Sequence, residues 1–280
     1  MRKIVVAFSV LFFTMAVTAQ TAIKVMSFNI RLDVKSDGEN SWENRKDKVA
    51  GLMNYYQADF IGGQEVQFHQ LQYLKEQLTG YEHIGVGRDD GKEKGEFSCI
   101  FYNKQNFEVL QQGTFWLSQT PDSVSMGWDA VCNRVCTWGL FRSKITKKQC
   151  WVFNTHFDHM GVKARQESAK LILSKMNGLT AGKNYPVVFM GDLNSKPGDE
   201  PVKILSESLD NARTVSVGKP YGPADTWNGF KFLQKPDGCI DYIFIRKGGK
   251  AKVVKFATIT DSYEMKYPSD HFPIMAQIEF

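Results

Sequence analysis

Hydrophobic residues recur along this chain at two different spacings, which together predict a protein of mixed strands and helices. Residues 23–30 and 59–66 are rich in β-branched and aromatic side chains, a pattern that favours strands. Between these strands, apolar residues recur at helical spacing and predict one buried helix face: Val49, Leu52, Met53 and Tyr56. A second helix is predicted at residues 68–78, where Gly80 ends the pattern.

The rest of the chain repeats this mixture with more strands. Apolar runs predict strands at residues 97–102, 107–110, 114–117, 134–141, 150–157, 186–192, 240–245, 252–259 and 272–280. A long helix is predicted at residues 162–176, and a short helix is predicted after Asp199. Two blocks of consecutive hairpin strands, each with helices, predict an α/β sandwich in which two mixed sheets pack face to face with helices outside.

The first residues have the pattern of an export signal. Arg2 and Lys3 precede an apolar run at residues 4–17, and Val17-Thr18-Ala19 has the small residues of a cleavage site. We therefore expect residues 1–20 to be a signal peptide and residues 21–280 to form one domain. The destination would be periplasmic or secreted, without stable membrane insertion, and we expect a monomer. A buried first strand or an uncleaved anchor is the alternative.

The charge balance permits an anionic substrate without indicating one. The whole chain has 35 basic and 30 acidic residues; without Arg2 and Lys3 the basic residues number 33, which leaves a net charge of +3. Dedicated DNA-binding proteins usually concentrate more positive charge. The five cysteines form no zinc-binding pattern, and an odd number leaves at least one unpaired, so buried free cysteines are expected.

Polar residues with catalytic chemistry follow the apolar run that ends at residue 190. Asp192 and Asn194 are two positions apart, so in a strand both side chains point the same way. A carboxylate there can take a proton from water, and the amide can orient the attack or bind a phosphate. The same residues, followed by Ser195, also suit a turn.

Histidines occur in two further places where apolar runs begin or end. Asp270-His271 precedes the last strand, and a protonated imidazole there can stabilise negative charge on a phosphate. His156 ends the predicted strand 150–157 and is interpreted as an acid, a base or a charge stabiliser. A zinc site from His156, Asp158 and His159 is disfavoured, because alternation along a strand separates these side chains.

An acidic residue at the end of the second predicted strand suggests a metal site. Glu65 follows Gly62-Gly63-Gln64, and together with Asp270 it could hold a hard divalent cation. Oxygen ligands favour Mg²⁺ or Mn²⁺ over zinc or copper. The alternative is a glutamate that stabilises the start of the following helix through the helix dipole.

The order of these residues resembles the endonuclease/exonuclease/phosphatase superfamily. The resemblance is carried by Ser27-Phe28-Asn29-Ile30-Arg31, Gln64-Glu65-Val66, Thr155-His156, Gly191-Asp192-Leu193-Asn194, Ile240-Asp241-Tyr242 and Ser269-Asp270-His271. It implies a four-layer α/β sandwich and metal-dependent hydrolysis of phosphoesters by water, without a covalent intermediate. It covers nearly the whole chain after residue 20.

The resemblance also implies individual roles. Glu65 would be the main metal ligand, with Asn29 and Asp270 close to the metal. Asp192 would activate water and Asn194 would bind the phosphate beside it. His271, oriented by Asp241, would face the phosphate, and His156 would be a second histidine paired with Glu96. We expect both histidine–carboxylate pairs to be hydrogen-bonded.

The substrate is less well defined than the chemistry. Gln67 stands where deoxyribonuclease I has a minor-groove arginine, and Arg31 stands where abasic-site enzymes have an aspartate. Arg134 is a candidate phosphate contact, and Trp227 a candidate to stack on a base or sugar. We therefore expect a phosphodiesterase or nuclease, or a phosphatase. Its partner would be a phosphoester substrate, and nucleic acid is one of the possible substrates. A phosphatase of small organic phosphates or lipid head groups is one alternative, and an inactive glycan- or protein-binding module is another.

Overall fold

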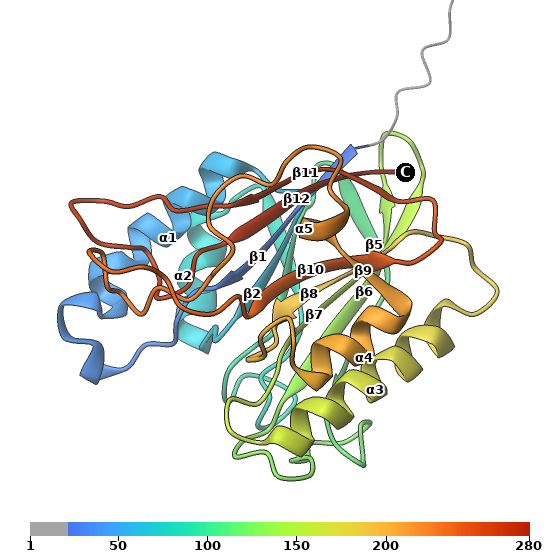
Figure 1. Cartoon of the computed structure of the whole chain (residues 1–280), viewed down its shortest axis with the longest axis horizontal. Coiled ribbons are helices and arrows are strands. Elements are labelled where there is room, and N and C mark those ends of the chain that lie inside the picture. The colour runs from blue at the N-terminus through green and yellow to red at the C-terminus, as the bar shows by residue number, and fades with distance from the viewer. Residues whose placement is uncertain (1–21) are drawn as a thin grey trace, which may run out of the picture.

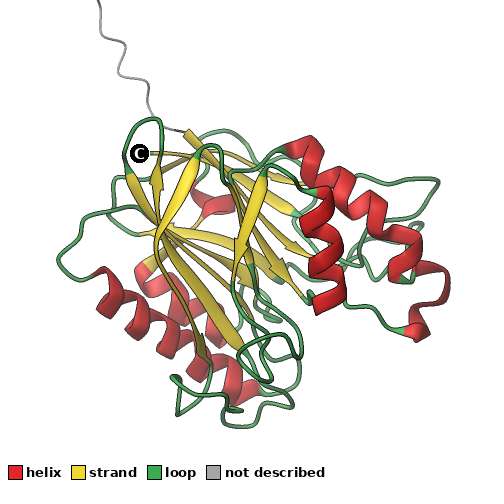
Figure 2. Cartoon of the chain, turned by 180° about the vertical axis from the view of Figure 1, so that it is seen from behind, coloured by secondary structure: helices red, strands yellow, loops and turns green. Residues whose placement is uncertain are grey.

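The structure, a computed structural model, describes residues 22–280; the expected signal peptide lies outside the described residues. Two six-stranded sheets pack face to face, and helices cover their outer faces (Figures 1 and 2). The predicted four-layer α/β sandwich is confirmed.

The first sheet contains the two ends of the described chain. Its strands, in spatial order, are β11 (Lys252–Thr258), β12 (Ile274–Glu279), β1 (Ala22–Asn29), β2 (Phe60–Gln64), β4 (Ile100–Asn103) and β3 (Tyr81–Ile84). β1 runs parallel to β2 and antiparallel to β12. The first strand of the described chain therefore lies in the middle of its sheet.

The second sheet has a similar centre. Its strands, in spatial order, are β5 (Phe107–Trp116), β6 (Val135–Ser143), β7 (Gln149–His156), β8 (Val187–Asp192), β10 (Asp241–Arg246) and β9 (Leu209–Asn211). β7 runs parallel to β8, and β10 runs antiparallel to β8. A parallel central pair in each sheet requires a crossover connection, and helices supply it.

Helices provide the two outer layers. They are α1 (Trp42–Tyr56), α2 (Phe68–Gln77), α3 (Val162–Thr180) and α4 (Glu200–Ser208). Two further short helices are the 3₁₀ helix η1 (Lys35–Asn40) and α5 (Ala212–Val215), whose Ala212 belongs to the apolar cluster between the sheets. α1 and α2 bury their apolar faces on the first sheet, and α3 and α4 do so on the second. A third apolar cluster, which includes Phe60, Val152 and Met190, fills the space between the sheets.

Several boundaries differ from the sequence prediction. The two strands predicted at 107–110 and 114–117 are one strand, β5, with an irregular register between Val109 and Gln111. The strand predicted at 97–102 begins only at Ile100, while Phe97 forms isolated bridges. The sequence did not predict β3, β9 or α5, because their short runs carry no clear apolar periodicity.

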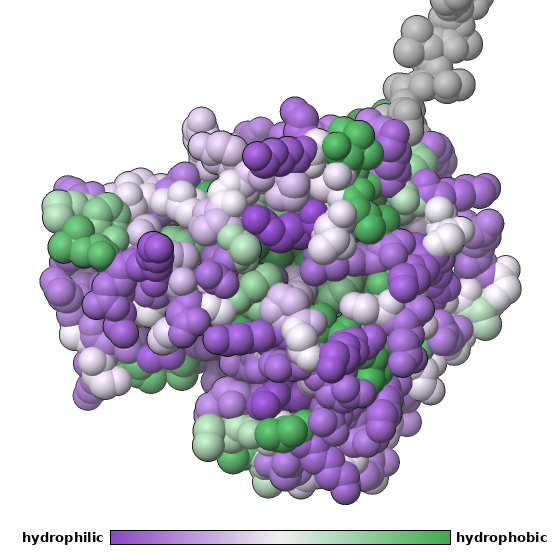
Figure 3. All heavy atoms as spheres, viewed as in Figure 1, coloured by the Kyte–Doolittle hydropathy of each residue, from purple (hydrophilic) through white to green (hydrophobic). Residues whose placement is uncertain are grey.

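The surface is largely hydrophilic on the face shown in Figure 3, and apolar residues form small separate groups there. No helix of residues 22–280 is long and apolar enough to cross a membrane.

Candidate active site

The strand directions place the predicted functional residues at one edge of the sandwich. β1 and β2 are parallel, so Asn29 lies beside Gln64 at their carboxyl ends. β7 and β8 are also parallel, and His156 lies beside Asp192. β10 runs the other way and begins at Asp241, directly opposite Asp192. Residues far apart in the sequence therefore meet because each stands at a strand end on the same side.

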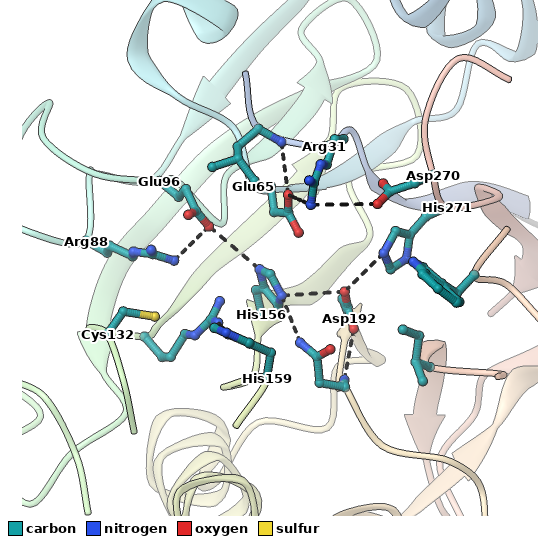
Figure 4. A pocket seen from close by; sticks show the side chains of 15 residues that line it. Arg31, Glu65, Arg88, Glu96, Cys132, His156, His159, Asp192, Asp270 and His271 are labelled. Atoms are coloured by element: carbon teal, nitrogen blue, oxygen red, sulfur yellow. Dashed lines mark hydrogen bonds and ion pairs between the residues drawn. The ribbon is translucent and has the colours of Figure 1, made fainter. Parts of the chain in front are cut away.

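These residues surround a cavity of about 530 Å³ (Figure 4). Nine of the predicted residues line it: Glu65, Glu96, Arg134, His156, Asp192, Asn194, Trp227, Asp270 and His271. Asn29 and Asp241 stand behind this lining and contact Glu65, Asp192 and His271. The structure thus brings every predicted site residue into one place.

Asp192 lies at the centre of the cavity floor. Its Oδ2 accepts a hydrogen bond from Asn29 Nδ2 at 3.0 Å and lies 3.5 Å from His156 Nε2 and 3.8 Å from His271 Nε2. Its Oδ1 accepts from the backbone N–H of Asn194 at 2.9 Å. Burial and the neighbouring Asp241 carboxylate raise the pKa of Asp192 to about 7. A carboxyl group with this pKa can accept a proton near neutral pH.

His271 has the carboxylate partner that the sequence predicted. Its Nδ1 donates to Asp241 Oδ2 at 2.9 Å, and both side chains are buried. Burial opposes the charge of the ring, but the carboxylate of Asp241, its hydrogen bond and the charge of Asp192 raise the pKa of His271 well above its ordinary value. The ring is therefore held as an imidazolium that faces the cavity.

His156 differs from the prediction. Glu96 Oε2 lies 3.9 Å from His156 Nδ1, beyond hydrogen-bond distance, and instead accepts from Arg88 Nη1 at 2.7 Å. The expected hydrogen bond is therefore wrong. Burial and the positive charges of Arg134 and Arg88 lower the pKa of His156 well below its ordinary value, so this ring is neutral.

The tautomer of His156 follows from its neighbour. Asn194 Nδ2 lies 3.0 Å from His156 Nε2 and also donates to the carbonyl oxygen of Phe157 at 3.0 Å. An amide nitrogen only donates, so Nε2 is the acceptor and the ring proton sits on Nδ1. His156 thereby holds Asn194, which has a left-handed φ of 44° at the end of β8.

Glu65 and Asp270 form the other end of the cavity. Glu65 follows β2 with a left-handed φ of 60°, which turns its side chain out of the sheet. Its Oε1 accepts from Asn29 Nδ2 at 3.0 Å, and its Oε2 accepts from the backbone of Leu32 at 2.9 Å. These carboxylates, both lining the cavity, are oxygen ligands of the kind that a hard divalent cation requires.

Asn29 is less suited to bind metal than the sequence indicated. Its Oδ1 accepts the backbone N–H of Arg31 at 3.0 Å, and its amide nitrogen donates to Glu65 and Asp192. The side chain is fully buried and does not line the cavity. Its hydrogen bonds thus position the two carboxylates, and a role of Asn29 at the metal stays a prediction.

Asp192, Asp241 and His271 also form a tight group, with one potential ligand atom from each within 4.8 Å of the others. His271 Nδ1 and Asp241 Oδ2 are already joined by a hydrogen bond. We therefore interpret the group as a hydrogen-bonded acid–base unit, and Glu65 and Asp270 as the residues that could hold a cation.

The two expected substrate contacts, Arg134 and Trp227, both line the cavity. Trp227 is half-buried, and its backbone bridges to that of His271. Arg134 is buried beside Asp158 Oδ2, at 3.4 Å, and His159 Nδ1, at 3.0 Å. Asp158 also accepts from the backbone of Gly161, so it is an anchor for Arg134 and the following turn.

Sequence reasoning did not assign roles to several residues that also line the cavity: Arg31, Arg88, Cys132 and His159. Arg88 lies in a loop with no apolar periodicity, and its position depends on Glu96. Arg31 belongs to the motif around Asn29, where the sequence indicated a departure from the abasic-site enzymes but no role.

Comparison with known proteins agrees with this geometry. Residues 26–271 match the model of the Endonuclease/Exonuclease/phosphatase family, so the chain belongs to that family. A structure of a family member from Bacteroides thetaiotaomicron is 38% identical, covers 93% of this chain and 98% of that chain, and has a TM-score of 0.90.

Two further structures have named activities or ligands. A mannosyl-6-phosphatase from Bacteroides thetaiotaomicron VPI-5482 is 39% identical, with 92% of this chain and 100% of that chain covered and a TM-score of 0.89. The human nocturnin catalytic domain, with a bound sulfate anion, is 22% identical over 92% of this chain and 93% of that chain, with a TM-score of 0.72. At 22% identity, the similarity to nocturnin concerns the fold alone.

Proposed function

We propose that this protein is an exported, Mg²⁺- or Mn²⁺-dependent phosphoester hydrolase whose substrates are small phosphomonoesters, with sugar phosphates as the first class to test. The observation that carries the proposal is the position of Asp192. Its buried carboxylate lies 3.5 Å from one imidazole and 3.8 Å from the other, in the cavity that Glu65 and Asp270 also line.

The geometry supports attack by water opposite the leaving alcohol. Asp192 takes a proton from the water as the new P–O bond forms and the ester P–O bond breaks. The departing alkoxide takes a proton from solvent, and Asp192 returns its proton to solvent before the next cycle. His271, held protonated by Asp241, stabilises the negative charge on the phosphoryl oxygens. A divalent cation bound by Glu65 and Asp270 would supply further charge stabilisation.

The other polar residues position these groups. Asn29 fixes Asp192 and Glu65 by its amide, and neutral His156 fixes Asn194. Asn194 also has its backbone N–H bonded to Asp192, so a single turn carries the base and the amide beside it. A binding module without activity would have no use for a buried carboxylate with a raised pKa, which favours the enzyme.

Two observations favour a small monoester over duplex DNA. The mannosyl-6-phosphatase is similar over nearly the whole chain. Gln67, at the place of a minor-groove arginine, accepts a hydrogen bond from the backbone of Asp33 at 3.1 Å, and its backbone N–H donates to Gln70 at 2.9 Å. The side chain and the backbone of Gln67 are therefore both held by hydrogen bonds at the start of α2. Export is supported by the basic and apolar pattern of residues 1–20.

A substrate panel tests the proposal. The protein, with Mg²⁺ or Mn²⁺, would be assayed on hexose 6-phosphates, other small monoesters, and supercoiled plasmid, with Asp192→Asn as the control. We expect release of phosphate from monoesters, at least ~100-fold slower in the variant. Metal-dependent plasmid nicking that falls steeply with salt, without monoester hydrolysis, would favour the nuclease instead.

A further inference from the structure

Arg31 is a charged residue of the cavity that the proposed reaction does not yet use. Its Nη1 lies 3.8 Å from Asp270 Oδ2 and 4.0 Å from Glu65 Oε2, too far for hydrogen bonds but close enough for strong attraction. Figure 4 shows the guanidinium between these two carboxylates. Among the described residues, no hydrogen-bond partner is found for this nitrogen.

The side chain is held firmly by its other edge. Nε and Nη2 donate to the two carboxylate oxygens of Asp37 in η1, each at 3.0 Å, in the bidentate arrangement that suits a guanidinium. The backbone N–H donates to Asn29, and the backbone carbonyl accepts from Gln70 at 2.9 Å. The residue has a left-handed φ of 61°, a strained conformation outside glycine. Nη1 is thus presented to the cavity by a rigid support.

The charges around Arg31 Nη1 determine which ligands this end of the cavity attracts. Three carboxylates (Glu65, Asp270 and Asp37) face two guanidiniums, those of Arg31 and the buried Arg45. A divalent cation would bring this group to a single net positive charge, whereas without Arg31 the group would be neutral. Arg31 therefore makes this end of the loaded site positive and adds to the attraction of an anion by the His271 imidazolium.

A phosphomonoester and a phosphodiester differ in the negative charge that a positive site attracts. The monoester carries close to two negative charges at pH 7, because its second pKa is about 6, while the diester carries one. The additional charge lies on an oxygen that would bear the second ester group in a diester. A fixed cation with free N–H groups is selective for such an oxygen.

We propose that Arg31, anchored by Asp37, forms a subsite for the second negative charge of a phosphomonoester and so selects monoesters over diesters. This inference rests on the proposed function and specifies its substrate class. Arg31 also repels the cation that Glu65 and Asp270 would hold, so the same residue weakens metal binding in the absence of substrate.

Calorimetry of ligand binding tests the proposal without a need for turnover. The full chain, loaded with Mn²⁺ at pH 8, would be titrated with inorganic phosphate, a dianion, and with dimethyl phosphate, a monoanion. In Arg31→Gln we expect phosphate to bind at least ~10-fold more weakly and dimethyl phosphate less than ~3-fold more weakly, a difference the lost charge predicts. The protein without phosphate should bind Mn²⁺ more tightly in this variant.

Two more variants complete the experiment. Arg142→Gln removes an arginine that pairs with Glu108 at the surface, and it should change neither affinity. Asp37→Asn keeps the guanidinium but loosens its anchor, and it should lose part of the preference for phosphate. Equal weakening of both ligands in Arg31→Gln, or unchanged phosphate binding, would overturn the proposal. A wild-type protein that binds phosphate selectively but hydrolyses no ester would instead overturn the proposed function.

Discussion

The two histidines beside Asp192 are held in opposite charge states by their surroundings. His271 has a carboxylate on its far nitrogen, whereas His156 is buried with arginines nearby and has no hydrogen bond to Glu96. Proximity to Asp192 is nearly equal for both rings, so the other charged groups around each ring separate their roles. This separation provides one charged group and one neutral positioning group in a single cavity.

Asp241→Asn tests how much of the activity depends on the charged ring. The carboxylate raises the pKa of His271, so its loss lowers that pKa and moves the alkaline limb of the kcat/KM profile to lower pH. We expect turnover to fall at least ~100-fold as well. A pH–rate profile with an unchanged alkaline limb would contradict the assigned role of this pair.

Asp192 should also affect stability in a pH-dependent way in the metal-free protein. Its folded pKa of about 7 is above the unfolded value of about 3.9, so between these pH values the folded state binds more protons than the unfolded state. The free energy of unfolding therefore falls as pH rises through this window and levels off above it. We expect the free energy of unfolding of Asp192→Asn minus that of wild type to increase by up to roughly 4 kcal/mol between pH 4 and pH 7.

Urea denaturation of both proteins at a series of pH values measures this difference. The comparison cancels the titration of groups that are common to both proteins. A difference that stays constant across the window would show that Asp192 titrates as an ordinary carboxyl group.

The close approach of the two sheets depends on a glycine in β2. A Cβ at Gly62 would lie 2.6 Å from Oδ1 of Asn154 in β7. Asn154 is fully buried, and its side chain bonds to Gln64 at 2.7 Å, Gly63 at 3.0 Å and Cys99 at 2.7 Å. This amide joins the central strands of both sheets directly below the site.

Gly62→Ala should therefore destabilise the protein. Overpacking costs about 1–3 kcal/mol and a broken buried hydrogen bond about 1–3 kcal/mol, which gives a loss of about 2–6 kcal/mol. Gly51→Ala is the matched control, because Gly51 lies in α1 with nothing near its Cβ position. We expect that control to gain up to about 1 kcal/mol through helix propensity. Equal melting temperatures for the two variants would contradict this description of the packing.

Strands with strong apolar runs could be predicted from the sequence, and so could the residues at their ends. Apolar runs place Asp192 and His156 at strand ends, and the structure adds the parallel pairing that brings them side by side. The partner of Glu96 could not be predicted in this way, because Arg88 reaches it from a loop whose path is set by turns. The role of Asn29 also depended on the direction of its amide, which no spacing pattern encodes.

At the scale of the whole molecule, metal binding should be visible as stability. A cation that binds only the folded state at 100 times its Kd stabilises it by about 2.7 kcal/mol. For a protein of this size, that raises the Tm by about 5–11 °C. We expect Mn²⁺ to produce this shift, EDTA to abolish both the shift and the activity, and Glu65→Gln to bind Mn²⁺ more weakly. An equal Mn²⁺ shift in Glu65→Gln would place the cation elsewhere.

The pairing of β1 with β12 constrains the order of folding. Ala22 pairs with Glu279 and Ser27 with Ile274, so the central strand β1 has β2 on one side early but gains its second neighbour only when β12 has been synthesised. Asp270 and His271 precede that strand, and they therefore join Asn29 and Glu65 late. Contacts so distant in sequence slow folding, since the intervening loop must close first. During refolding, recovery of phosphate binding should follow the slowest phase of the fluorescence change, and a nascent chain should stay inactive until β12 has left the ribosome.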